Sequence, residues 1–443
     1  MRARLASEAG FPLCSRDAMA SSSPGKKGRA RGKRDKGPQK PTVRRLGKDR
    51  GLKISPPAVR SVQAGHPWVF RDSVLRSLDG VSSGTPVPVS DEDGRGIGWG
   101  LYEPEGAVAV RMVSTEPDFT WGPEVLEQRV AAALAHRETA LDDGIRGSCR
   151  LVHAEGDGIP GVAADRLGEF VLVYKYARCV DAYLEPLIEI LDSRLSPAGI
   201  YLQDRVKPVT PEERRPGAAH MKGKTAPTDL VIDEDGLKYL VDPSAPVSPG
   251  LFLDLREGRR WVESLASGRR VLNLFSFTGS LGLRAVRGGA QAVVNVDAAA
   301  RSHTRCRQNL EASGLDGQAC KPLTGDVFKH LEKLRQRREA FDLVVVDPPP
   351  FSRVKGKVFS ALKDWRSLME AIAGVCAPGA DVIAISNASR LPDDEFMSAL
   401  GAGALARGRA ARLLGECGLP PDFPVPPAFA EGRYLKVKRL GLV

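Results

Sequence analysis

The residues best suited to chemistry follow a buried strand that the sequence predicts. That strand, Phe341–Val346 (FDLVVV), runs into Asp347–Phe351 (DPPPF), which combines a carboxylate, prolines and an aromatic ring. Proline fixes the backbone angle φ and has no N–H to donate, so neighbouring carbonyls stay free to accept from the nitrogens of a base. The aromatic ring offers a surface on which a base can stack. The stretch predicts a shelf for a nucleobase; the alternative is a proline-rich turn without function.

Further polar residues follow three other predicted strands. A turn after the first strand contains glycine, which lets the backbone approach a ligand closely. Asp297, after the second strand, is placed to accept from ribose hydroxyls, and Asp326, after the third, could accept from an adenine amino group. Each acid has an ordinary alternative as a helix N-cap. The ligand contacts predicted along this edge are Asn273, Phe275, Thr278, Gly279, Asp297, Asp326 and Asp347.

Strands and helices alternate throughout residues 244–443. The predicted strands are Val271–Phe275, Ala292–Val296, Phe341–Val346 and Val382–Ser386, with further candidates at Ala411–Gly415 and Tyr434–Lys438. The predicted helices are Gly279–Arg287, Ala299–Ser313, Val327–Gln336 and Ala361–Val375. This alternation indicates an α/β fold with a parallel sheet and helices on both faces, and such sheets bind ligands outside the carboxyl ends of their strands. The G-x-G-x-x-G fingerprint is missing, which argues against a nicotinamide cofactor.

The chain before residue 244 divides into four parts by composition. Residues 1–50 hold 15 Lys or Arg against 4 Asp or Glu, which accounts for the whole net charge of +11. This composition predicts a basic disordered arm. The arm either binds the phosphate backbone of a nucleic acid or acts as a solubilising tail. Residues 51–120 show the short strands of a small β-barrel, and residues 121–149 predict a linker helix. Residues 150–243 predict an α+β domain, with a loop at 207–228.

Composition also excludes several classes of protein. The chain has 443 residues, 42% of them hydrophobic, and lacks the apolar run of about 18 residues that a membrane span requires. Its seven scattered cysteines include no C-x-x-C pair, so we expect neither disulfides nor a metal site, and a reducing cytoplasm as the location. Residues 1–20 lack the pattern of a secretory signal, and Met19 is an alternative start.

Several strings resemble one family, the bacterial large-subunit ribosomal-RNA methyltransferases. Gly65–Phe70 (GHPWVF) is similar to a segment of the family's N-terminal PUA domain, and Leu151–Gly168 is similar to a signature of its central domain. Pro249–Arg256 (PGLFLDLR) resembles the segment that covers the methionine end of the cofactor. The DPPPF string resembles a motif of methyltransferases that modify nucleobases. Asp157 and Asp165, within the second string, are interpreted as solvated acids of a hairpin rather than catalytic residues.

The resemblance covers about residues 51–443 and implies three domains: a PUA-like β-barrel, a central α+β domain and a class I Rossmann-like methyltransferase domain. It implies S-adenosylmethionine as cofactor and 23S rRNA or a large-subunit particle as partner, with no membrane and no metal; a homodimer is left open. It adds Phe252, Asp254 and Arg256 to the cofactor contacts. The RNA contacts that it implies are His66, Trp68, Arg353 and Lys355, although His66 on its own reads as a core or turn residue.

Relatives of this kind use two chemistries, and Asn387 separates them. Methylation at cytosine C5 requires a Cys thiolate that attacks C6, and the cytosine enzyme carries this Cys in an FSCSG-like string after the fifth strand. Here the string is Ile385–Arg390 (ISNASR), in which Asn387 replaces the Cys. Cys376, at the end of a predicted helix, is interpreted as a buried apolar residue. The string instead resembles that of a guanine-N7 methyltransferase, in which placing N7 in line with the methyl group suffices.

The sequence therefore predicts a guanine-N7 rRNA methyltransferase. Its predicted catalytic residues are Asp347, Pro348, Pro349, Phe351 and Asn387. Two alternatives stay open. The N-terminal barrel resembles the cytosine enzyme more closely, which leaves a cytosine-C5 methyltransferase with a displaced Cys. The other alternative is a catalytically inactive RNA-binding assembly factor, against which the intact cofactor positions argue.

Overall fold

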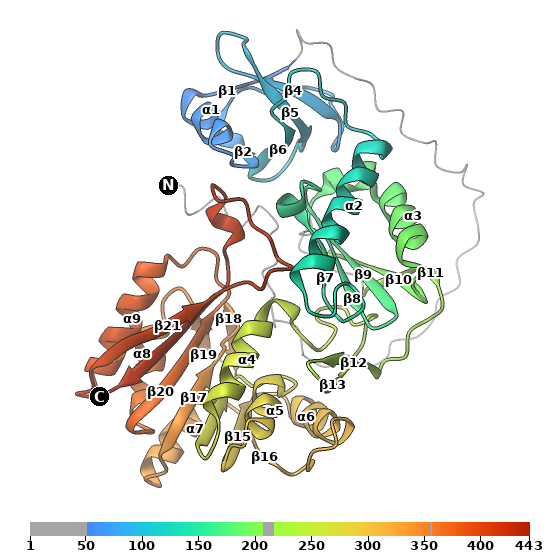
Figure 1. Cartoon of the computed structure of the whole chain (residues 1–443). Coiled ribbons are helices and arrows are strands. Elements are labelled where there is room, and N and C mark those ends of the chain that lie inside the picture. The colour runs from blue at the N-terminus through green and yellow to red at the C-terminus, as the bar shows by residue number, and fades with distance from the viewer. Residues whose placement is uncertain (1–50, 207–216, 355–356) are drawn as a thin grey trace, which may run out of the picture.

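The computed structural model describes residues 51–206, 217–354 and 357–443, which form three domains in chain order. Figure 1 shows the N-terminal domain in blue, the central domain in green, and the C-terminal domain from yellow to red. The red connection between the last two strands extends away from the C-terminal sheet toward the other two domains (Figure 1). No helix within the described ranges is long and apolar enough to cross a membrane.

The N-terminal domain is a six-stranded sheet with the order β2-β6-β5-β4-β1-β3. Its elements are β1 (Leu52–Ile54), α1 (Pro56–Gln63), β2 (Trp68–Phe70), β3 (Val74–Arg76), β4 (Pro86–Ser90), β5 (Gly96–Tyr102) and β6 (Val108–Ser114). Alternating valines and isoleucines of these strands, such as Val87 and Val89, are fully buried in its core. The short strands that the sequence predicts in this region are confirmed.

The central domain is a five-stranded sheet with the order β11-β10-β9-β8-β7, covered by two helices. Its elements are α2 (Pro123–Ala140), β7 (Arg150–His153), β8 (Val162–Leu167), β9 (Phe170–Lys175), α3 (Leu184–Leu195), β10 (Gly199–Asp204) and β11 (Ala219–Gly223). Helix α2 connects the first two domains, and its apolar face also packs into the core of the central one. A hairpin follows, formed by β12 (Leu230–Glu234) and β13 (Leu237–Val241). Its two-residue turn has positive φ at both Asp235 and Gly236, as tight hairpins require.

The C-terminal domain is a seven-stranded sheet with the order β16-β15-β14-β17-β20-β22-β21. Its strands are β14 (Arg270–Leu274), β15 (Ala292–Asp297), β16 (Cys320–Thr324), β17 (Phe341–Val346), β20 (Cys376–Ser386), β21 (Ala411–Cys417) and β22 (Lys436–Leu442), and a small hairpin pairs β18 (Phe351–Val354) with β19 (Lys357–Ser360). Its helices are α4 (Arg256–Leu265), α5 (Ser280–Arg287), α6 (Ala300–Ala312), α7 (Val327–Gln336), α8 (Trp365–Ala373) and α9 (Asp393–Leu405). Strand β22 runs antiparallel to its neighbours, whereas β14 to β17 and β20 are parallel.

Helices cover both faces of this sheet, as the sequence predicts. Apolar residues of α4, α5 and α6 pack on one face, and those of α7, α8 and α9 pack on the other. The inner strands β14 and β17 are almost continuous apolar runs because both of their faces are buried. All parallel strands point their carboxyl ends to one edge, so the turns that follow them lie together.

Two local predictions are wrong. Part of the expected loop 207–228 is strand β11, which pairs antiparallel with β10; residues 207–216 lie outside the described part of the chain. Cys376 begins strand β20 instead of ending a helix. The sequence hides this start because Pro378 and Gly379 follow, and the register of β20 against β17 shifts across them. The interpretation of Cys376 as a buried apolar residue is confirmed.

The acids of the β7–β8 hairpin are buried rather than solvated. Asp165 is 5% exposed, and its Oδ1 accepts from Arg150 Nε at 2.5 Å. Asp157 accepts from the fully buried Arg137 at 2.6 Å and from the backbone N–H of His153. Local polarity suggested solvent contact, but arginines from neighbouring elements neutralise both carboxylates inside the domain.

Candidate active site

A pocket lies where three parallel strands of the large sheet end side by side. Leu274 of β14 pairs with Val346 of β17, which in turn pairs with Ala384 of β20. The pocket has a volume of about 380 Å³, including its open mouth. Its lining residues are Phe252, Asp254, Leu255, Asp347, Pro348, Pro349, Ile385, Asn387 and Leu435. The pocket thus brings together the segment before α4, the turn after β17 and the end of β20, as the sequence predicts.

The described lining of this pocket contains two carboxylates and no basic side chain. Asp347 directly follows β17 and is 8% exposed. Asp254 precedes α4, and its Oδ2 accepts a hydrogen bond from the Tyr434 hydroxyl at 2.8 Å. Burial raises the pKa of Asp254, and the Tyr434 hydrogen bond offsets only part of this rise. Two desolvated carboxylates in one pocket are costly, and a positively charged ligand would compensate them.

The turn between β14 and α5 has an unusual backbone. Phe275, Phe277 and Gly279 all have positive φ, at 57°, 46° and 79°. Non-glycine residues adopt such angles rarely, and strained backbone of this kind concentrates at ligand sites. The Thr278 hydroxyl donates to the carbonyl of Gly250 at 2.7 Å, so the turn is fastened to the segment that lines the pocket. A Cβ on Gly279 would lie 2.3 Å from the Cys306 Sγ, so packing also requires glycine at this position.

Asp297 and Asp326 follow β15 and β16 at the same edge of the sheet. Both oxygens of Asp297 accept backbone N–H groups, from Phe277 at 2.8 Å and from Ala299 at 2.9 Å. Asp326 caps α7, because its Oδ1 accepts from the backbone N–H of Lys329 at 2.9 Å. The N-cap interpretation of Asp326 is confirmed. Cofactor contacts of both acids stay predictions, since each carboxylate oxygen can accept more than one hydrogen bond.

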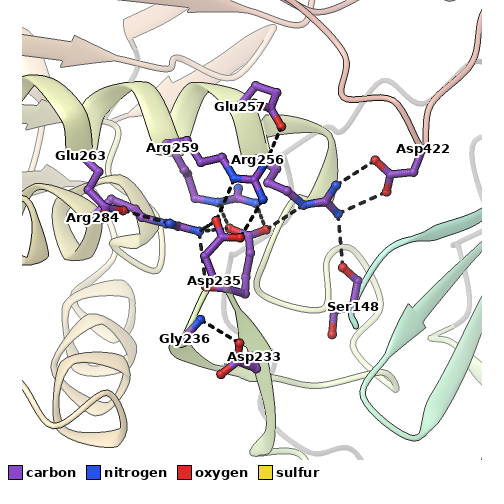
Figure 2. Close-up of polar contacts among 12 residues, drawn as sticks. Ser148, Asp233, Asp235, Gly236, Arg256, Glu257, Arg259, Glu263, Arg284 and Asp422 are labelled. Atoms are coloured by element: carbon purple, nitrogen blue, oxygen red, sulfur yellow. Dashed lines mark hydrogen bonds and ion pairs between the residues drawn. The ribbon is translucent and has the colours of Figure 1, made fainter. Parts of the chain in front are cut away.

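Asn273 and Arg256 are not brought into the pocket lining. Asn273 is buried, and its Nδ2 donates to Asn295 Oδ1 at 3.0 Å. Arg256 is 4% exposed and donates to both oxygens of Asp422, at 2.8 and 3.2 Å. It also donates to the backbone carbonyl of Ser148 at 3.2 Å (Figure 2). The pattern of local residues suggested a cofactor contact, but the guanidinium of Arg256 joins elements of different domains.

Asn387 follows β20 directly and lines the pocket. Its Oδ1 is buried and has no hydrogen-bond partner among the described residues. A buried acceptor without a partner is costly, so its presence beside a pocket indicates that a ligand supplies the missing donor. Pro348 and Pro349 line the same pocket, as predicted. The predicted roles of the Phe351, Arg353 and Lys355 side chains lie outside the described part and stay predictions.

The described thiols differ in their distance from this pocket. Cys376 starts β20 level with Phe341, which places it roughly 25 Å from Asn387 along the strand. Cys417 of β21 pairs with Val437 of β22, and Val437 pairs on its other side with the pocket residue Ile385 of β20. Cys417 therefore lies two strand spacings, roughly 10 Å, from Ile385. Burial raises the pKa of Cys417 to about 11 and that of Cys376 to about 12. Both thiols are therefore protonated at neutral pH and are poor nucleophiles.

His66 and Trp68 lie in a contact between domains. Trp68 is 2% exposed, donates from Nε1 to Glu155 at 2.8 Å, and packs edge-on against Phe429 with 4.6 Å between ring centroids. His66 Nε2 lies 3.1 Å from an oxygen of Glu431. Burial of both side chains favours the interpretation of His66 as a core residue. Their predicted contact with RNA stays a prediction.

Sequence reasoning missed several residues of the site. Leu255, Ile385 and Leu435 line the pocket, and Tyr434 donates to the pocket residue Asp254. Ile385 is the first residue of the ISNASR string at the end of β20, which could have suggested it. Tyr434 and Leu435 carry no such signal, because they end a connection between β21 and β22 whose path depends on the other domains. Throughout the described ranges, no group of three His, Cys, Asp or Glu side chains could hold a metal ion.

Comparison with protein families assigns two parts of the chain. Residues 149–431 match the model of an S-adenosylmethionine-dependent methyltransferase family, and residues 52–115 match that of a PUA-like domain. The chain is 30% identical over 380 residues to the ribosomal RNA large subunit methyltransferase I of Photobacterium profundum, covering 85% of this chain and 95% of that protein. The enzyme of the same name from Serratia proteamaculans is 31% identical over 379 residues, with the same coverage.

Two solved structures share the fold over most of the chain. A methyltransferase complexed with SAH has a TM-score of 0.80 at 24% identity, covering 88% of this chain and 99% of that one. A methyltransferase from Streptococcus mutans has a TM-score of 0.78 at 23% identity, with the same coverage. At this level of identity the likeness establishes the fold.

Proposed function

The chain belongs to the S-adenosylmethionine-dependent methyltransferases, and from this premise we propose that it methylates guanine N7 in large-subunit (23S) ribosomal RNA. The observation that carries the proposal is the pocket at the strand ends, with Asp254, Asp347 and Asn387 in its wall, where Asn387 Oδ1 has no hydrogen-bond partner among the described residues. The names of the curated relatives support ribosomal RNA as the substrate class. The PUA-like domain suits an RNA partner as well.

The residues of the pocket fit the cofactor of the family. S-adenosylmethionine carries a sulfonium and an ammonium group, and when bound it supplies an electrophilic methyl group. Asp254 and Asp347 would compensate the positive charge of the cofactor. They are the two charged side chains in the described lining of the pocket. Phe252 and Phe277, whose rings are 5.5 Å apart, would form an apolar wall that excludes water. Asp297 and Asp326, at the ends of the neighbouring strands, would hold the nucleoside part, as the sequence predicts.

The choice of guanine N7 rests on the chemistry of the pocket wall. N7 has a free lone pair, so methylation there requires correct placement but no covalent nucleophile. The Watson–Crick edge of guanine presents N–H donors at N1 and N2. Asn387 Oδ1 and the Asp347 carboxylate offer buried acceptors for such donors, and the prolines at 348 and 349 add none that compete. Placing that edge against Asn387 leaves N7 on the opposite side of the ring, free to react.

Methylation of cytosine C5 is the second candidate, and one observation favours it. Cys417 is separated from the pocket residue Ile385 by only one strand. A thiolate is needed for this chemistry. Because burial raises the pKa of Cys417 to about 11, the thiol would have to be activated by a group that the described pocket wall does not contain. Cys376 is too far from the pocket to act.

Nucleoside mass spectrometry separates these chemistries. The protein is incubated with methyl-labelled S-adenosylmethionine and undermodified large-subunit rRNA, and the digested RNA is analysed for labelled nucleosides. We expect 7-methylguanosine, a loss of about 10²-fold in N387A, and full activity in the matched variant C417S. Labelled 5-methylcytidine that disappears in C417S would establish the covalent route instead. No label, together with no calorimetric binding of S-adenosylmethionine, would identify an RNA-binding assembly factor.

A further inference from the structure

One wall of the pocket is a segment without regular strand structure. Residues 249–255 precede α4, and Phe252, Asp254 and Leu255 from this segment line the pocket. Apart from one short turn at Leu253–Leu255, its backbone groups depend on contacts with other parts of the chain. Four hydrogen bonds from the rest of the chain fasten it. The backbone N–H of Asp242 donates to the carbonyl of Pro249 at 2.7 Å, and Thr278 Oγ1 donates to the carbonyl of Gly250 at 2.7 Å. Nearer the pocket, Arg259 Nη1 donates to the carbonyl of Phe252 at 2.7 Å, and the Tyr434 hydroxyl donates to Asp254 at 2.8 Å.

The Arg259 guanidinium is fixed at its other side by a buried carboxylate. Its Nε and Nη2 donate to the two oxygens of Glu234, at 2.7 and 2.5 Å, and both residues are buried. Glu234 lies on β12 of the hairpin that precedes this segment, and Arg284 also donates to it at 2.8 Å. Arg256 Nε lies 3.6 Å from a Glu234 oxygen as well, and Figure 2 shows Arg256, Arg259 and Arg284 close together beside Asp235. Burial alone would raise the pKa of Glu234, but the three guanidiniums hold it below its ordinary value.

Arg259 therefore uses all three of its nitrogens in fixed positions. Two grip Glu234 in a bidentate pair, and the third points at the Phe252 carbonyl. The guanidinium is planar and rigid, so the position of the hairpin carboxylate sets the position of the pocket wall. A lysine keeps the charge but has a single nitrogen, which cannot hold both partners in this geometry.

We propose that Arg259 is a positioning residue that fixes the Phe252 wall and thereby sets the affinity of the pocket for its cofactor. The inference rests on the proposed function of this pocket as the S-adenosylmethionine site. It differs from a merely structural role, in which Arg259 would only neutralise Glu234. Arg284 provides the comparison, because it is equally buried and also bound to Glu234, while its other acceptors, on Asp235 and Glu263, lie outside the pocket lining.

The test compares R259K with R284K in the full-length protein. Calorimetry measures the Kd for S-adenosylmethionine at a temperature where thermal unfolding shows all proteins folded. We expect R259K to raise the Kd about tenfold and R284K to change it by less than about twofold, even where R284K lowers the melting temperature as much. With labelled cofactor and rRNA, R259K should raise the KM for S-adenosylmethionine and leave kcat at saturation nearly unchanged.

Equal Kd values for the two variants, or a Kd that follows the melting temperature across them, would overturn the inference. If R259K does not fold, R259Q is measured in the same way, because its amide can reach only one of the two partners. Failure of the parent protein to bind S-adenosylmethionine would instead overturn the proposed function, and the inference with it. Binding by the parent with no difference between variants leaves the proposed function intact and removes only the role of Arg259.

Discussion

Replacing Asp422 by asparagine should lower the melting temperature by roughly 6–12 °C, because one buried carboxylate joins two domains. Asp422 is fully buried in the β21–β22 connection (residues 418–435). Its Oδ1 accepts from Arg256 Nη1 at 2.8 Å, and its Oδ2 accepts from the backbone N–H of Arg150 at 2.8 Å. Its own carbonyl accepts from Arg137 Nη2 at 2.8 Å. Arg256 belongs to α4 of the C-terminal domain, whereas Arg150 and Arg137 belong to the central domain.

The magnitude follows from what D422N leaves behind. The amide has the shape of the carboxylate but no charge, and its NH₂ group must face one of the donors. Removing one partner of a buried ion pair costs about 3–5 kcal/mol of unfolding free energy. Glu234 Oε2 lies 3.6 Å from Arg256 Nε and still compensates part of its charge, so we expect about 3 kcal/mol. For domains of 150–250 residues, 1 kcal/mol shifts the melting temperature by about 2–4 °C.

Differential scanning calorimetry measures this effect, with E332Q as the matched control. Glu332 also pairs with an arginine, Arg335, but both side chains are nearly half exposed on α7. Solvent screens such pairs, so E332Q should leave the melting temperature nearly unchanged. If D422N and E332Q have the same melting temperature, the reasoning is refuted, because the Asp422–Arg256 pair would then contribute no more than a surface contact. A split of one transition into two would show in addition that Asp422 couples the domains.

Three further outcomes are expected. Affinity for S-adenosylmethionine should rise as the pH rises through the raised pKa of Asp254, because only the ionised carboxylate attracts the cationic ligand. D254N should flatten the dependence of the calorimetric Kd on pH. If D254N leaves this dependence unchanged, Asp254 is not the acid responsible. G279A should cost about 2–6 kcal/mol in denaturant unfolding, from φ strain and from overlap with Cys306. C306A in the same background should restore only the part of the packing cost that Sγ causes, because the Cβ of residue 306 would still lie 2.7 Å from the added Cβ. Deletion of residues 1–50 should reduce the salt dependence of RNA binding, and an unchanged slope would mean that the arm does not contact RNA.

The fold of the C-terminal domain could be predicted because its signals are local. Strand Phe341–Val346 and helix Val327–Gln336 have the predicted bounds, since a strand buried on both faces is a continuous apolar run and Asp326 marks the helix start. Asp347 and Asn387, which line the pocket, directly follow the ends of β17 and β20, so predicting these strand ends also placed the two residues. Parallel strands bring their carboxyl ends together in any such sheet, so most of the pocket could be placed before the structure was known.

The partners of buried charges could not be predicted in the same way. Arg256 lies in a string that resembles a cofactor segment, yet its carboxylate partner is Asp422, 166 positions further along the chain. His66 contacts Glu431, which lies 365 positions further along the chain. No periodicity marks such pairs, because a buried arginine needs only some carboxylate in reach, and the packing of the domains decides which one. The sequence therefore assigned no role to the β21–β22 connection, although it supplies Leu435 to the pocket.

These long-range pairs change what counts as the functional unit. The boundary between residues 243 and 244 follows a real change in sequence pattern, but the ion pairs that Arg259 and Arg284 make with Glu234 cross it. A fragment that begins at residue 244 would lack Glu234, the carboxylate that Arg259 and Arg284 share. It would also lose the contact that fixes Phe252 in the pocket wall. The family model begins at residue 149 and ends at residue 431, so it includes both the hairpin and most of the β21–β22 connection. The pocket is therefore a property of the two domains together, because residues outside the Rossmann-like sheet hold the wall against which the cofactor would bind.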